Sequence, residues 1–218
     1  MRSFLERDVP GFNTRISPVA IERIWVMLAH MHGQLLNKAA LAHALGVDGH
    51  SVNNYLDLLE GAFMIRRLPP YYSNTKKRLV KSPKVYIRDS GILHSLLQIS
   101  SDHDLFRHSV YGFSWEGLVI ENIIGRLTPG VSAFFYRTAQ RAEADLLLEQ
   151  GTTRIVIEIK ASSAPKVERG FWNVLDDIRP DFARVVAPVE RRYSLKEGVE
   201  VLSLEDIISE GCTAGWLR

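Results

Sequence analysis

Apolar residues recur at helical spacing near the start of the chain. One face of residues 18–32 carries Ile21, Ile24, Trp25, Leu28 and Met31. This i, i+3, i+4 repeat is typical of an amphipathic helix. Pro18 suits the first helical position, and Gly33 suits the end. The pattern therefore predicts a helix over residues 18–32.

Two more helices are predicted close behind the first. Asn37 can cap a helix over residues 38–45 that stops at Gly46, and a third spans residues 49–61. Two helices joined by a short glycine-containing turn are typical of a helix-turn-helix. Predicted strands at 63–68 and 84–88 would add a wing, followed by a short helix over 92–97 and a linker at 100–104. The first half is therefore predicted to be a winged helix-turn-helix.

The second half alternates helices with strands. Ser114 can cap a helix over 115–124, and apolar runs predict strands at 132–137, 143–149 and 153–161. A helix over 167–178, strands at 183–187 and 199–202, and a helix over 205–208 complete the chain. Interleaved strands and helices indicate an α/β unit. The predicted domains are 1–100, of α+β character, and 101–218, an α/β domain.

Composition narrows the class of protein. The chain has 218 residues, 46% hydrophobic and 24% charged, as in a soluble globular protein. No apolar run reaches the roughly 18 residues of a membrane helix, and the start lacks a signal-peptide core. Cys212 is the single cysteine, so no disulfide can form within the chain. A cytoplasmic protein with no membrane partner is expected.

Basic residues are concentrated between the two predicted wing strands. The net charge is only +2, yet residues 66–88 contain Lys and Arg side chains and no Asp or Glu. A basic wing with neighbouring aromatic residues suits phosphate contacts. The candidate nucleic-acid-binding residues are Asn53, Asn54, Arg66, Arg67, Lys76, Lys77, Arg78 and Lys81. A solvated hairpin, or a basic surface for an acidic protein, stays open as an alternative.

Three residues carry the most specific chemistry. Asp145 stands in one predicted strand, and Glu158 and Lys160 stand in the next, with Gln150-Gly151 between them as a turn signal. Residues i and i+2 of a strand share a face, so Glu158 and Lys160 should point the same way and meet Asp145. Two carboxylates and an ammonium suit a divalent metal and a developing phosphate charge. A solvated salt bridge on a half-exposed strand is the alternative.

The order helix, three strands, helix, strand resembles the restriction-endonuclease-like core. That resemblance implies a Mg²⁺ site held by Asp145, Glu158 and the main-chain carbonyl of Ile159. It implies Glu116 as a fourth catalytic residue, placed at a positive helix start. Lys160 would orient the attacking water or neutralise the transition state. Because neighbouring carboxylates would keep Lys160 protonated, neutralisation of the transition state is the favoured role.

The chain also resembles the carboxy-terminal half of prokaryotic AAA-type ATPases, in which a winged helix and a nuclease-like domain of unknown function follow the ATPase module. The matching segments are 5–10, 77–86, 89–91, 115–116, Arg137, 143–145 and 157–160. The chain has no Gly-x-x-x-x-Gly-Lys-Ser/Thr loop, so it has no ATP site of that kind. It is therefore expected to begin where the ATPase module would end.

Two functions follow from this resemblance. The first is a DNA-binding protein with Mg²⁺-dependent phosphodiester hydrolysis, coupled to an ATPase module that this chain lacks. The alternative is a catalytically inactive nuclease fold that serves recognition or assembly. Expected partners are DNA and either an ATPase module or further copies of the chain.

Overall fold

The computed structural model describes residues 17–72, 79–140, 142–196 and 198–218. Lys76, Lys77 and Arg78 lie outside the described residues. The chain divides into two compact units, and residues 68–81, which interrupt the sequence of the first unit, belong to the second. The helical unit comprises residues 1–67 and 82–117, and the α/β unit comprises 68–81 and 118–218. The predicted domain boundary at 100/101 lies within the helical unit.

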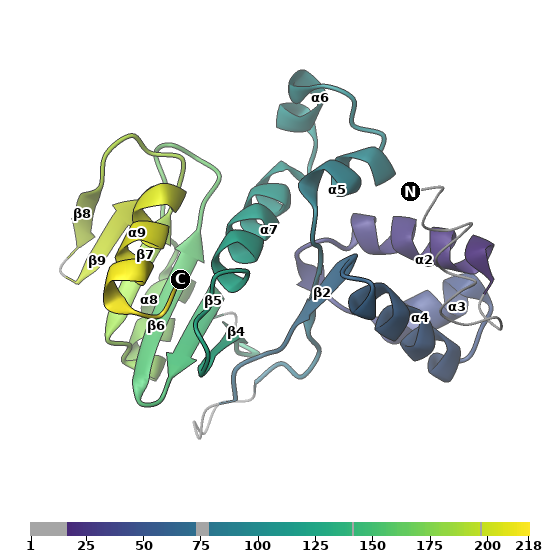
Figure 1. The fold of residues 1–218 in the computed structure, drawn as a ribbon, viewed down its shortest axis with the longest axis horizontal. Coiled ribbons are helices and arrows are strands. Elements are labelled where there is room, and N and C mark those ends of the chain that lie inside the picture. The colour runs from purple at the N-terminus through teal and green to yellow at the C-terminus, as the bar shows by residue number, and fades with distance from the viewer. Residues whose placement is uncertain (1–16, 73–78, 141, 197) are drawn as a thin grey trace. The chain divides into compact units, whose positions relative to one another are not determined.

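The helical unit combines a set of helices with a small sheet. Its elements are α2 (Pro18–His30), β1 (Gln34–Leu35), α3 (Lys38–Leu45), α4 (Gly49–Gly61), β2 (Ile65–Leu68), β3 (Lys84–Ile87), α5 (Ser90–Leu96), α6 (Asp102–Arg107) and the start of α7 (Tyr111–Ile124). The sheet has the order β1-β3-β2, and β1 is antiparallel to β3. These elements are purple to teal in Figure 1.

Local signals set the ends of the helices. The side chain of Asn37 accepts a hydrogen bond from the Ala40 N–H at 3.0 Å, and Gly46 ends α3 in the left-handed conformation at φ 66°. Asp48 caps α4 by accepting from the Ser51 N–H at 2.7 Å. Each cap pairs a main-chain N–H that the helix leaves unsatisfied. The predicted bounds of α3 and α4 are confirmed.

The apolar faces of these helices form one core. Ile21, Ile24, Trp25 and Leu28 of α2 are buried, as the helical spacing predicts. Burying one such side chain contributes about 1.5–3 kcal/mol relative to exposing it. Two predictions were wrong. The linker at 100–104 enters α6, because Ser101 accepts from the Asp104 N–H and caps it. The helix predicted to be capped by Ser114 begins at Tyr111, so Glu116 lies in its second turn and not at its start.

The α/β unit is built on a six-stranded mixed sheet. Its strands are β4 (Val131–Arg137), β5 (Glu143–Gln150), β6 (Thr153–Ile159), β7 (Phe182–Val186), β8 (Tyr193–Lys196) and β9 (Val199–Leu202), in the order β4-β5-β6-β7-β9-β8. β4, β5 and β6 are antiparallel neighbours, whereas β6, β7 and β9 run parallel. The predicted strands are present, and β8 is an additional strand.

Helix α8 (Arg169–Ile178) connects the parallel strands β6 and β7. It packs against β5 and β6, with Phe171, Val174 and Ile178 buried in the core of this unit. Helix α9 (Leu204–Ala214) follows β9 and begins with a capping box formed by Ser203 and Asp206. A helix that connects two parallel strands starts near the carboxyl end of the first. Residues 160–168 connect the end of β6 to the start of α8.

The segment between β2 and β3 is held on β4. The backbone contacts are Tyr71 N–H to Phe135 O (2.7 Å), Phe135 N–H to Pro69 O (3.0 Å) and Val80 N–H to Arg137 O (3.1 Å). We call residues 69–72 and 79–81 the β4 strap. The sequence predicted a basic wing here, whereas both described ends of the segment pair with β4. They cover a strand edge that would otherwise expose unpaired main-chain groups.

Tyr71 anchors the β4 strap. Its side chain is buried in the core of the α/β unit, and its ring meets that of Phe134 edge-on at 5.4 Å between centroids. Its hydroxyl donates to Oε1 of Glu149 at 2.7 Å. Burial, then the bond to Glu149, raises the pKa of Tyr71. The strap is therefore fixed by side-chain as well as main-chain contacts.

Candidate functional site

Asp145 and Glu158 lie side by side at the ends of β5 and β6. Leu146 pairs with Ile157 in the antiparallel register, so Asp145 and Glu158 are the next opposed residues. Oδ2 of Asp145 accepts a hydrogen bond of 2.9 Å from the Ile159 N–H. Both carboxylates are buried, with 8% and 7% of the residue surface exposed. The register therefore places the two acids opposite each other on neighbouring strands, and their joint role stays a prediction.

Lys160 completes the predicted trio. Its Nζ lies 2.7 Å from Oε1 of Glu158, and its side chain is 30% exposed. Burial alone would lower the pKa of Lys160. Glu158 outweighs that effect, with smaller contributions from Asp145 and Glu168, so the pKa is raised. Lys160 is therefore an ammonium at neutral pH, suited to pairing with negative charge and unsuited to accepting a proton.

Glu168 is a neighbour that sequence reasoning missed. It is the residue that precedes α8, and its side chain makes no capping hydrogen bond. Its negative charge makes a small contribution to the raised pKa of Lys160. The signal was available in principle, because a helix following a parallel strand begins at the carboxyl end of that strand. Three carboxylates thus contribute to the raised pKa of Lys160, and Glu158 is the one in direct contact with it.

The donor set limits how a metal could be held. Within the described ranges, no group of three or more His, Cys, Asp and Glu side chains is arranged to hold a metal ion. Asp145 and Glu158 supply two carboxylates. Mg²⁺ is commonly held by one or two carboxylates, together with waters and substrate phosphates. The predicted ligands Asp145, Glu158 and Ile159 therefore fit Mg²⁺ better than a cation that needs a full protein cage.

Glu116 has partners within the helical unit. Its Oε1 accepts from Nζ of Lys84 at 3.1 Å and from the hydroxyl of Tyr86. Glu116 is 8% exposed and Lys84 is 3% exposed, so the ion pair is buried. Removing one member of such a pair costs about 3–5 kcal/mol. This pairing gives Glu116 a structural role, and its predicted catalytic role stays a prediction.

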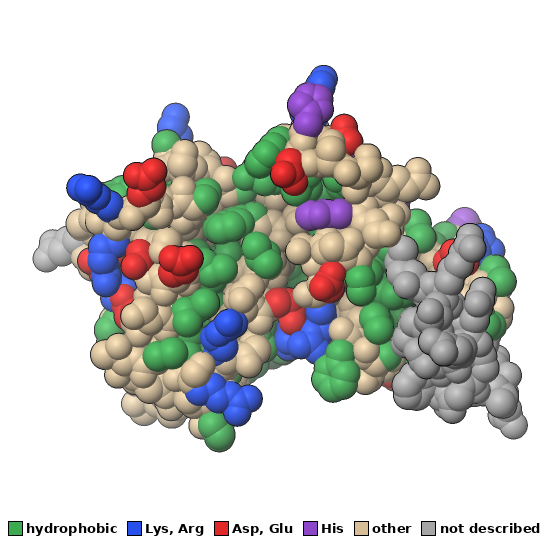
Figure 2. Space-filling view, turned by 45° about the horizontal axis from the view of Figure 1, so that its top comes forward, with side chains coloured by type: hydrophobic (Ala, Val, Ile, Leu, Met, Phe, Trp, Pro, Cys, Tyr) green, Lys and Arg blue, Asp and Glu red, His purple; other side chains and the backbone are tan. Residues whose placement is uncertain are grey.

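The residues predicted to bind nucleic acid differ in their side-chain partners and in their exposure. Arg67 donates to Glu60 through Nε at 2.7 Å and to Asp57 at 2.8 Å, so its charge is paired with α4. Asn53 accepts from Nζ of Lys38 at 2.8 Å. The other described candidates are Asn54 and Lys81, both exposed, and Arg66, half-buried. On the face drawn in Figure 2, basic side chains stand beside acidic ones.

Comparisons with known proteins identify relatives without a described function. Residues 1–103 match the model of a domain of unknown function, DUF8612, and residues 111–207 match another, DUF4143. Uncharacterized proteins of Mycobacterium bovis and Mycobacterium tuberculosis are each 39% identical over 209 residues, which is 96% of this chain.

The chain spans about half the length of these curated relatives, 47% in each case. No solved structure gave a significant match. Among the described helices, none has the length and apolar character needed to span a membrane. The chain is thus a two-part α+β protein, similar along nearly all its length to longer mycobacterial proteins.

Proposed function

We propose that the α/β unit hydrolyses phosphodiester bonds of DNA in a Mg²⁺-dependent reaction at Asp145, Glu158 and Lys160. The observation that carries the proposal is the 2.9 Å hydrogen bond between Ile159 N–H and Asp145. It holds one carboxylate beside a second carboxylate, on strands that also position an ammonium. Ligands commonly bind outside the carboxyl ends of parallel strands, where Glu158 and Lys160 lie.

The two carboxylates would hold the metal, with the Ile159 carbonyl as an added oxygen ligand. A bound Mg²⁺ supplies Lewis acidity toward a phosphoryl oxygen. The chain's own contribution is to fix Asp145 through the Ile159 N–H and to keep both carboxylates in a poorly solvated site. Desolvation strengthens their attraction for a divalent cation.

Lys160 would stabilise the negative charge that develops on phosphate. Its raised pKa keeps the proton on Nζ, so we assign it electrostatic work and not general-base work. Its present partner is Oε1 of Glu158, at 2.7 Å. Glu158 would hold the metal ion, and Lys160 would then pair with a substrate phosphate.

The helical unit supports a targeting role on DNA. Its order, helix, strand, two helices and two strands, with sheet order β1-β3-β2, is that expected for a winged helix. Helix α4 would occupy the major groove and present Asn53 and Asn54. Arg67 is paired with Asp57 and Glu60, so other basic residues would have to provide the affinity for DNA phosphates. Lys81 is one of these among the residues that the structure describes.

Coupling to an AAA-type ATPase module is a further part of the proposal. The curated relatives are about twice as long as this chain, which leaves room for such a module in them. The alternative, an inactive nuclease fold used for recognition or assembly, is favoured by the direct ion pair between Lys160 and Glu158. In that case the pair is structural.

A cleavage assay distinguishes these two functions. Supercoiled plasmid is incubated with Mg²⁺ or Mn²⁺ and wild type, Asp145→Asn, Lys160→Met or Asp176→Asn. Asp176 is an exposed carboxylate on α8 and serves as the matched control. We expect Asp145→Asn and Lys160→Met to lose at least about 100-fold in rate, as for loss of a catalytic group, and Asp176→Asn to match wild type. Absence of cleavage by wild type would favour the recognition module.

A further inference from the structure

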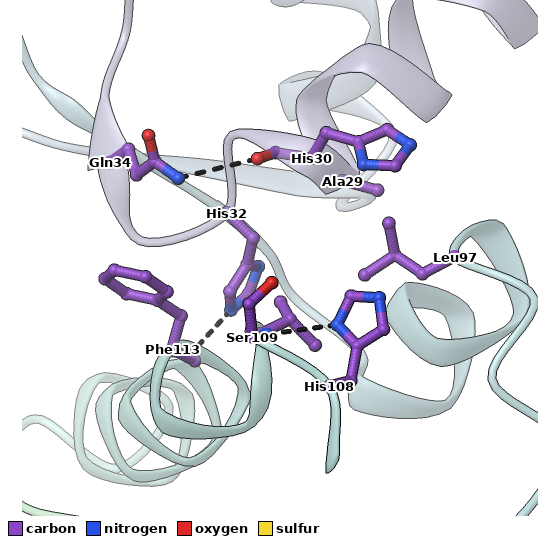
Figure 3. Close-up of a pocket in the computed structure, with 9 residues that line it drawn as sticks. Ala29, His30, His32, Gln34, Leu97, His108, Ser109 and Phe113 are labelled. Atoms are coloured by element: carbon purple, nitrogen blue, oxygen red, sulfur yellow. Dashed lines mark hydrogen bonds between the residues drawn. The ribbon is translucent and has the colours of Figure 1, made fainter. Parts of the chain in front are cut away.

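A small pocket opens on the helical unit, and none of its lining residues belongs to the candidate site described above. It has a volume of about 180 Å³ and is lined by Ala29, His30, His32, Gln34, Leu97, His108, Ser109, Val110 and Phe113. Figure 3 shows His30, Leu97 and His108 on one side and Phe113 and Gln34 on the other. The volume is below the roughly 300–1,000 Å³ of sites for drug-sized ligands. It suits a single ring system.

The residues around Phe113 are tightly packed. Gly33 has φ 74°, and a side chain there would approach the Phe113 ring to 2.5 Å. A Cβ on Gly117 would likewise meet His32 at 2.5 Å. His32 donates from Nε2 to the Phe113 carbonyl at 3.0 Å and accepts from the Ile87 N–H at Nδ1. The pocket is therefore part of a tightly packed framework.

A main-chain hydrogen bond determines the tautomer of His108. Its Nδ1 accepts a hydrogen bond of 3.0 Å from the Val110 N–H. An imidazole that accepts at Nδ1 carries its proton on Nε2 when it is neutral. His32 is held in the same tautomer by Ile87. In the neutral form both rings therefore carry their proton on Nε2, and His32 donates that proton to the Phe113 carbonyl.

The lining set named above includes no Asp, Glu, Lys or Arg among the residues that the structure describes. It offers hydrogen-bond donors and acceptors from His108, Gln34 and Ser109, between apolar walls that include the exposed ring of Phe113. Such a lining recognises uncharged planar rings that have polar edges. Highly charged ligands would lack a fixed counter-charge here.

We propose that this pocket binds a nucleobase, with its edge at His108 and its face against Phe113. Stacking on an aromatic side chain together with edge hydrogen bonds is the usual way in which proteins hold an unpaired base. The base can belong to a free nucleoside or to a single-stranded nucleic acid. The proposal does not depend on the metal site.

The test is an NMR titration of the full chain, following the imidazole ¹⁵N and Phe113 ring signals. Adenosine, guanosine, cytidine and uridine are added separately, then ribose 5-phosphate, then a short single-stranded oligonucleotide. We expect at least one nucleoside to bind with a dissociation constant on the order of 1 mM, reasonable for a single ring system. His108→Ala should weaken binding at least about tenfold. His43→Ala, an exposed histidine on α3, should not.

Comparing nucleosides with the oligonucleotide shows whether the bound base belongs to a free nucleoside or to a nucleic-acid strand. Nucleosides that bind alone, and an oligonucleotide that binds more tightly through the same residues, identify the base of a strand as the occupant. Nucleosides that bind as tightly as the oligonucleotide identify a free nucleoside. Perturbation by ribose 5-phosphate alone, or binding unchanged in His108→Ala, would overturn the proposal. So would the absence of any nucleoside-induced shift.

Discussion

The Ile159 N–H donates a 2.9 Å hydrogen bond to Oδ2 of Asp145, joining two residues 14 positions apart. This bond continues the pairing of β5 and β6 past the point where their main chains pair. It fixes a buried carboxylate beside Glu158, whose own Oε1 meets Lys160. The two strand ends therefore present acid, acid and ammonium as one group.

Replacing Lys160 with Met should destabilise the chain by about 1–3 kcal/mol at pH 7, because Glu158 loses a charged hydrogen-bond partner. The pKa of Lys160 is raised in the folded chain above the ordinary lysine value of 10.5. Its stabilising effect is therefore complete below about pH 10.5 and is lost as pH rises through the folded-state pKa. Denaturant unfolding at several pH values measures both effects. Lys166→Met, at an exposed lysine, should retain the alkaline dependence.

Glu116→Gln should destabilise the helical unit by about 3–5 kcal/mol, because it leaves the buried Lys84 ammonium without its carboxylate. The double variant Glu116→Gln with Lys84→Met should lose less than the two single changes combined, since no uncompensated charge remains. Urea unfolding of the four proteins gives the coupling free energy. Additive losses would show that the pair has no structural role.

Tyr71→Phe should lower the free energy of unfolding by about 1–3 kcal/mol, because the partly buried Glu149 carboxylate loses a hydrogen-bond donor. Exchange of the Phe135 and Val80 amides, which bond across the β4 strap, should accelerate. Hydrogen exchange followed by NMR reads both amides. The control is Tyr72→Phe, at a tyrosine with 61% of its surface exposed. Unchanged exchange in Tyr71→Phe would mean that the hydroxyl contributes nothing to holding the strap.

Reversing Lys76, Lys77 and Arg78 to Glu should weaken duplex DNA binding. If all three touch phosphates, the slope of log K against log salt should fall by roughly 2–3. Arg67→Gln should leave that slope unchanged, because Arg67 is already paired with Asp57 and Glu60. Fluorescence anisotropy over a range of salt concentrations provides the slopes. An equal effect of both variants would argue against a special role for residues 76–78.

The sequence predicted those features that local patterns encode. Asn37 and Gly46 bound a helix because capping depends on a few neighbouring residues. Asp145 and Glu158 could be placed together because a tight turn at Gln150-Gly151 determines the register of one hairpin. Tertiary contacts between distant segments have no such local signal.

Three tertiary contacts changed the interpretation. Lys84 counted as part of a basic surface segment, yet it is buried against Glu116. Arg67 was a candidate for phosphate binding, and it is paired with two acids of α4. Both described ends of the predicted wing lie on β4, because Tyr71 finds an apolar site and a carboxylate there. Each contact joins residues that no periodicity relates.

The most direct test of the central claim is calorimetric titration of Mn²⁺ into wild type and Asp145→Asn. Asparagine can still accept the Ile159 hydrogen bond, so the variant removes charge while keeping the local geometry. The account predicts one saturable site in wild type and at least about tenfold weaker binding in Asp145→Asn, with Asp176→Asn unchanged. Equal binding by wild type and Asp145→Asn, or no binding by wild type, would contradict a metal site at Asp145 and Glu158.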